Sequence, residues 1–194
     1  MNRREAIKKT GMMLGFAAGS PLLLHVLQGC APEKTLSWKP LFFNKKQAHL
    51  VSEIVDQILP RTDTPGALDV GVDAFVDKMV AEVYTEKEQQ QFVRGLDAIN
   101  TNSKGVNGEL FSDLSSERKH EFLFRIESEI KRLDYNADPE QKPFFLMIKE
   151  LTLLGYFTSE EIMKNHLDYM PVPMKLDGCE PMKENQKLRV GNYF

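Results

Sequence analysis

The sequence predicts an all-α protein, a single compact bundle of about five to six helices with an extended C-terminal arm. Three observations favour this fold class. Apolar residues recur at the three- and four-residue spacing of amphipathic helices along most of the chain. Capping-box pairs, in which Ser, Thr or Asn is followed three residues later by Glu or Gln, stand at several of the expected helix starts. The alternation of apolar and polar residues that marks a strand does not extend convincingly beyond four residues.

Composition and turn signals divide the chain into four segments. Residues 1–29 are a predicted signal peptide, and residues 30–41, with prolines near both ends, are a predicted tether. Residues 42–168 carry the helical patterns and form the predicted domain. Residues 169–194 form the predicted arm.

The first thirty residues predict export and lipid attachment. Arg3 and Arg4 stand side by side, and residues 11–29 form an uncharged run rich in glycine and alanine. This pattern resembles a twin-arginine (Tat) signal, which is read by a translocase and removed from the mature chain. Leu-Gln-Gly before Cys30 resembles a lipobox, so we expect an acylated Cys30 and a lipoprotein on the periplasmic side of the membrane. The alternative, an uncleaved spanning helix, fits the glycines and polar residues of this run less well.

Charge and cysteine content restrict the possible partners. The net charge is −3, and removal of the signal peptide leaves 21 basic and 27 acidic residues. This balance favours binding neither to nucleic acid nor to anionic lipid. Acylation of Cys30 leaves Cys179 as a single cysteine in an oxidising compartment, where it is expected to form an intermolecular disulfide, a free thiol or a buried inert thiol.

Six segments share helical spacing and are separated by turn or proline signals: residues 44–59, 72–83, 85–99, 116–133, 143–157 and 158–167. Asn44, Thr85 and Thr158 each begin a capping box. The polar stretch NTNSKGVNG, residues 100–108, predicts a loop. Residues 143–157 are apolar nearly all round and predict the central helix of the bundle.

The C-terminal segment differs from the rest of the chain. Pro171, Pro173 and Pro181 prevent a long helix there, yet methionine and tyrosine residues make it too apolar for a free linker. We expect an extended arm that lies on its own domain or on a partner.

The sequence contains no recognisable active site. HExxH, CxxCH, GxGxxG, GxxxxGK[ST] and GxSxG patterns are all missing, so no cofactor of its own is expected. Asp63 and Asp69 could form a metal or acid–base pair, but a role in a turn and in capping the helix near Val72 is the simpler interpretation. His120 and His166 are interpreted as surface or edge-of-core residues rather than ligands.

Four features together resemble the gluconate 2-dehydrogenase subunit 3 family, the small subunit of membrane-bound flavin dehydrogenases. The first is the twin-arginine start. The second is ILPRTDTPGALDVGVDAFVD, residues 58–77, and the third is LTLLGYFTSEE, residues 151–161. The last is YMPVPMKLDGCEPM, residues 169–182.

The resemblance implies a non-catalytic subunit. Such small subunits pair with a large FAD-containing oxidoreductase of the glucose–methanol–choline type, often together with a multihaem cytochrome c. The large subunit binds FAD in the cytoplasm and must cross the membrane folded, which is the kind of cargo that Tat carries. The small subunit then serves as escort and membrane tether.

The resemblance also suggests where the large subunit is contacted. The expected contact residues are Tyr156, Phe157, Pro171, Pro173 and Cys179, and Cys179 is the candidate for a disulfide to the large subunit.

Two other functions stay open from the residues. One is a stand-alone envelope lipoprotein that binds a ligand or a protein. The other is an enzyme in its own right, which would need carboxylates such as Asp63 and Asp69 to converge in a pocket.

Overall fold

The structure is a computed structural model, and it describes residues 36–132, 142–170, 172, 181, 184 and 187–190. The chain divides into two units, residues 1–35 and residues 36–194, and every described residue belongs to the second unit. Arg3, Arg4 and Cys30, on which the export and lipid predictions depend, lie outside the described residues.

The described residues form an all-α fold, which confirms the predicted fold class. The α-helices are α2 (Lys45–Ile58), α3 (Val72–Glu82), α4 (Glu86–Asn107), α5 (Ser116–Arg132) and α6 (Phe144–Phe157). The shorter elements are two 3-10 helices, η1 (Leu68–Val70) and η2 (Phe111–Asp113), a π-helical turn η4 (Ile162–His166), and the strands β1 (Asp168–Tyr169) and β2 (Arg189–Val190). None of the helices in this described part combines the length and hydropathy needed to cross a bilayer.

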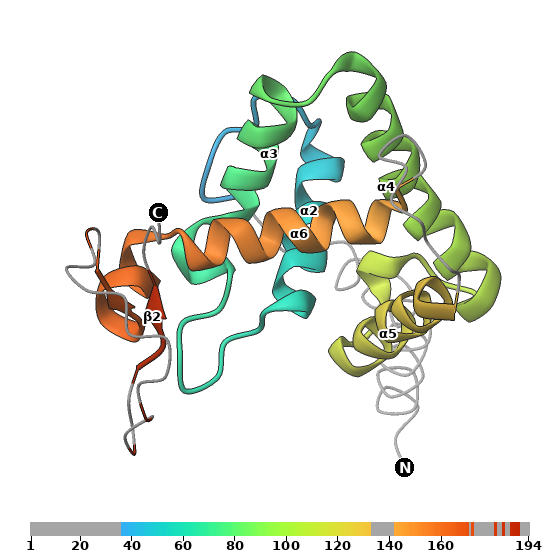
Figure 1. Cartoon of the computed structure of the whole chain (residues 1–194). Coiled ribbons are helices and arrows are strands. Elements are labelled where there is room, and N and C mark those ends of the chain that lie inside the picture. Colours follow the sequence, from blue (N-terminus) through green and yellow to red (C-terminus); the bar gives the residue numbers. More distant parts are fainter. Residues whose placement is uncertain are drawn as a thin grey trace, which may run out of the picture. The chain divides into compact units, whose positions relative to one another are not determined.

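Helix α6 lies at the centre of the fold, as its apolar sequence predicts. It contacts α2, α3 and α4 and crosses the middle of the bundle (Figure 1). These neighbours cover one side of α6, so its buried residues fall on one half of the helix, and the other half carries the exposed Glu150, Leu154 and Phe157. The buried residues are Phe145, Met147, Ile148, Leu151, Thr152, Gly155 and Tyr156.

Two glycines allow α6 to approach its neighbours closely. A Cβ atom at Gly155 would lie 2.6 Å from Cδ1 of Phe75 on α3. At the other end of α6, a Cβ atom at Gly95 of α4 would lie 2.2 Å from Cβ of Phe144. Glycine at both positions therefore sets the spacing of the central helix to α3 and to α4.

Two of the three predicted capping boxes are confirmed. Asn44 accepts from the backbone N–H of Gln47 and Thr85 from that of Glu88, and each partner side chain accepts from the cap residue in return. The box at Thr158 is wrong. The Thr158 hydroxyl donates to the carbonyl of Leu154 at 2.7 Å, because this residue ends α6 instead of starting a new helix.

The predicted loop at residues 100–108 is also wrong, because α4 continues through it to Asn107. Ser103 lies in the protein interior, where its hydroxyl donates to the carbonyl of Glu109 at 3.0 Å. The helix ends at Gly108, whose φ of 78° suits glycine at a C-terminal cap. Tertiary contacts therefore outweigh the weak helix propensity of the polar residues.

Most of the predicted arm lies outside the described residues. In the described part, β1 and β2 pair in parallel, with Asp168 opposite Arg189 and Tyr169 opposite Val190. The chain near residue 189 therefore lies beside the segment that follows the π-helical turn.

Candidate partner-binding site

Asp77 on α3 holds the chain that leads into the first described helix. Its carboxylate accepts from three successive backbone N–H groups, those of Leu41 at 2.6 Å, Phe42 at 3.2 Å and Phe43 at 2.9 Å. Asp77 is only 1% exposed, so these donors replace the water that a carboxylate otherwise requires.

Asp73 lies one helical turn earlier and holds the same segment. Its Oδ2 atom accepts from the indole N–H of Trp38 at 2.8 Å and from the hydroxyl of Ser52 at 2.7 Å. Leu36, Trp38 and Phe42 also pack against the core. The structure therefore places residues 36–41 in the domain, whereas the sequence assigned them to the tether.

The motif around Tyr156 supports the loop that precedes α3. The Tyr156 hydroxyl donates to the carbonyl of Pro65 at 2.8 Å, and the residue is 8% exposed. The loop is compact at Gly66, where a Cβ atom would lie 2.6 Å from the backbone nitrogen of Arg61. Tyr156, a predicted contact residue, thus joins two family motifs 91 residues apart and offers little surface of its own.

The two carboxylates considered as a possible catalytic pair belong to a turn. Asp69 accepts from the backbone N–H of Gly66 at 2.7 Å and pairs with Arg61 at 3.1 Å, while Asp63 is exposed. Asp69 does not cap α3, because the N-cap residue is Gly71, which has no side chain to do so. The turn interpretation of Asp69 is therefore confirmed, and its capping role is wrong.

An exposed apolar surface lies at the C-terminal end of α6. Leu154 is 47% exposed and Phe157 is 46% exposed, and their spacing of three residues places them on one side of the helix. The Phe157 ring stands edge-on to that of Tyr156, with centroids 5.3 Å apart. We call Leu154 and Phe157 the α6-end surface. Tyr156, which the Phe157 ring contacts, is itself held by its hydrogen bond to Pro65.

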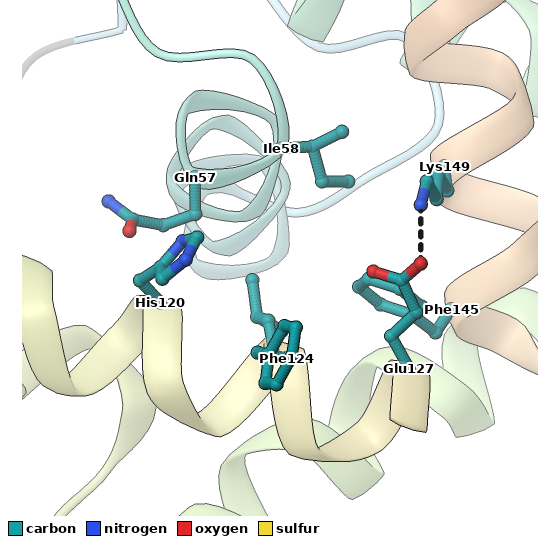
Figure 2. Close-up of a pocket in the computed structure, with 8 residues that line it drawn as sticks. Gln57, Ile58, His120, Phe124, Glu127, Phe145 and Lys149 are labelled. Carbon is teal, nitrogen blue, oxygen red and sulfur yellow. Dashed lines mark hydrogen bonds and ion pairs between the residues drawn. The ribbon is translucent and has the colours of Figure 1, made fainter. Parts of the chain in front are cut away.

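A small hollow lies between α2, α5 and α6 (Figure 2). Its volume is about 100 Å³, whereas pockets for drug-sized ligands usually have about 300–1,000 Å³. Phe124, His120 and Glu127 line it from α5 and Lys149 from α6. This hollow therefore does not provide room for a flavin.

The carboxylate in this hollow is held as an anion. Glu127 pairs with Lys131 at 2.8 Å and with Lys149 at 2.9 Å. Both ammonium groups donate to the Glu127 carboxylate and hold its pKa below the usual range. A carboxyl group with a lowered pKa is ionised at neutral pH and cannot serve there as a general acid.

Two wider hollows, of about 540 and 610 Å³, lie beside β1 and beside Phe42. Nowhere among the described residues do three or more His, Cys, Asp or Glu side chains come together in a way that could hold a metal ion.

Of the predicted contact residues, Tyr156 and Phe157 lie in the described part of the chain. Pro171, Pro173 and Cys179 lie outside it, and their roles stay predictions.

The sequence analysis did not identify Asp73 and Asp77 as functional residues. Their four-residue spacing beside the apolar stripe of α3 was the signal that both carboxylates face inward.

The fold and this surface define a small all-α protein in which a buried core supports an exposed apolar helix end. The chain belongs to the gluconate 2-dehydrogenase subunit 3 family, whose model matches residues 45–174 and confirms the predicted resemblance. The matched region contains α2 to α6 and both motifs joined by the Tyr156 hydrogen bond. Comparisons with curated proteins and with solved structures gave no match.

Proposed function

We propose that this chain is the non-catalytic small subunit of a periplasmic FAD-dependent dehydrogenase that acts on sugars or sugar acids. Membership of the gluconate 2-dehydrogenase subunit 3 family is the observation that carries this proposal. The chemistry belongs to a large flavoprotein subunit, with a cytochrome c as a further possible member of the complex.

In this proposal the small subunit escorts its partner through Tat and holds it at the membrane. Tat transports folded cargo, and the paired Arg3 and Arg4 can serve both chains if they travel as one complex. A lipid on Cys30 would then retain the complex at the periplasmic face, because two or more acyl chains give stable anchoring.

The α6-end surface is the proposed contact for the large subunit. Exposed apolar side chains that lie together on a surface favour protein association. The support from Tyr156 and Pro65 keeps Phe157 in place before binding, which lowers the entropy lost on association.

The test is gentle purification of the tagged chain from its native membranes, followed by an absorbance spectrum and a non-reducing gel. We expect a flavin spectrum, a second chain of oxidoreductase size, and a change in mobility on reduction if Cys179 forms the disulfide. Phe157→Asp should remove most of the flavoprotein, because a buried unpaired charge opposes association. A colourless, solitary wild-type chain would contradict the proposal and favour the stand-alone lipoprotein.

Phe124→Asp is the matched control. Phe124 is also an exposed phenylalanine, but it lies on α5 at the small hollow rather than on the α6-end surface. Normal flavoprotein recovery with Phe124→Asp, together with loss in Phe157→Asp, supports the assigned contact. The opposite pattern would place the contact at the hollow.

A further inference from the structure

The segment held by Asp73 and Asp77 exposes an apolar side chain. Leu41 is 67% exposed, although Phe42 beside it packs against the core and Phe43 is buried. The three backbone donors to Asp77 hold the backbone of this stretch in the conformation that exposes the Leu41 side chain.

Three exposed lysines surround Leu41 in the sequence. Lys39 lies two residues before it, and Lys45 and Lys46 begin α2. No ion pair joins these lysines to a carboxylate of the described residues, and the first turn of α2 has no acidic residue. Cations in a first turn oppose the helix dipole, so Lys45 and Lys46 do not stabilise α2. We call Lys39, Leu41, Lys45 and Lys46 the N-terminal surface.

Covalent geometry keeps the N-terminal surface near any lipid carried by Cys30. Leu36 already packs against the core, so a tether that starts at Cys30 can extend no further than residue 35. Six residue steps from Cys30 to Leu36 span at most roughly 20 Å. A tether reaching residue 41 would allow about twice that distance.

We infer that the N-terminal surface contacts the membrane, with Leu41 in the interfacial region and the three lysines against anionic headgroups. This inference rests on the proposed lipid at Cys30, and it specifies which side of the helical domain faces the membrane. The overall acidic charge of the chain does not oppose it, because electrostatic attraction to a membrane falls off within a Debye length and depends on local charge. An apolar side chain flanked by lysines is also the composition that favours the membrane interface.

Trp38 provides a direct probe, because it is the one tryptophan of the chain and lies three residues from Leu41. The full chain, purified from membranes with its lipid, is reconstituted into vesicles of phosphatidylethanolamine and phosphatidylglycerol whose acyl chains carry bromine. Brominated chains quench tryptophan fluorescence only at short range. We expect quenching of Trp38, and a decrease of that quenching as salt is raised.

Two variants test the surface itself. Leu41→Asp, and a triple variant that combines Lys39→Glu, Lys45→Glu and Lys46→Glu, should each lose the quenching while they still sediment with the vesicles. Val106→Asp is the matched control, because Val106 is an exposed aliphatic residue on α4, and it should leave the quenching unchanged. Unaltered far-ultraviolet circular dichroism shows that each variant is folded.

The outcomes separate this inference from the proposed tether. A chain that sediments with the vesicles while Trp38 stays unquenched overturns the membrane contact and leaves the tether intact. Quenching that survives in both surface variants also overturns the assigned residues. A chain that stays in the supernatant overturns the lipid tether, and with it the contact. Flavoprotein recovery is measured separately and bears on the dehydrogenase subunit alone.

Discussion

At the scale of single residues, two carboxylates on one helix decide where the folded domain begins. Asp73 and Asp77 are buried among valines of α3, where an ionised group without partners would be very costly. Trp38 and residues 41–43 donate to them from more than thirty residues earlier in the chain, and Ser52 donates to Asp73 from α2. These carboxylates therefore organise structure, and nothing in their surroundings requires a catalytic role.

Asp77→Ala should lower the free energy of unfolding by about 1–3 kcal/mol, because three backbone donors lose a charged acceptor. Urea denaturation followed by circular dichroism measures the change. Asp63→Ala removes an exposed carboxylate from the turn and should change stability by no more than about 0.5 kcal/mol. Equal stability of the two variants would contradict the assigned role of Asp77.

At the scale of secondary-structure elements, small residues set how closely the helices pack. Helix α6 meets α4 through Gly95 and α3 through Gly155, so both of its ends depend on a missing side chain. Figure 1 shows α6 reaching between these two neighbours. The apolar sequence of α6 predicts its burial but says nothing of which neighbour requires a glycine.

Two glycine substitutions should have effects of opposite sign. Gly155→Ala places a methyl group 2.6 Å from the Phe75 ring and should destabilise the fold by about 1–3 kcal/mol through overpacking. Gly105→Ala adds the same methyl group to α4 where nothing lies within 4 Å. Because alanine has the higher helix propensity, this second variant should gain about 0.5–1 kcal/mol. Thermal unfolding of both variants checks the sign, and a stabilised Gly155→Ala would show that α3 and α6 can separate freely.

At the scale of the whole molecule, the folded domain is one component of a larger proposed complex. Its core includes Tyr156, which adjoins the α6-end surface, and Leu36 and Phe42, which adjoin the N-terminal surface in the sequence, pack against that core. The proposed signal and lipid attachment site precede the domain in the sequence. In the proposed function, export and lipid attachment depend on residues that precede the helical domain, whereas the contact with the large subunit lies on that domain.

Shared export can be tested at this scale. Under the proposed function, replacing Arg3 and Arg4 together by lysine should leave both this chain and the proposed flavoprotein partner in the cytoplasm, because a Tat translocase reads such an arginine pair. Cell fractionation followed by immunoblotting of both proteins measures the effect. A partner that still reaches the periplasm in normal amounts would refute the escort role.

Local chemistry was enough to predict much of this protein. Helical spacing, the capping boxes at Asn44 and Thr85, and the apolar residues of α6 act over neighbouring turns, so the elements and the central helix could be read from the sequence. Prediction was least reliable where local signals were weak or ambiguous. Thr158 ends a helix instead of starting one. Ser103 belongs to α4 instead of a loop, and its hydroxyl forms a hydrogen bond to Glu109 in the interior.

Only the tertiary structure decided which distant groups meet. Asp77 accepts hydrogen bonds from residues 41–43, and Tyr156 donates one to Pro65. Gly155 leaves space for the ring of Phe75. In each case the two groups are separated by many residues in the chain. The physical reason is that propensity and periodicity act over a few residues, whereas burial of a charge, a hydroxyl or a ring depends on what the whole chain brings beside it.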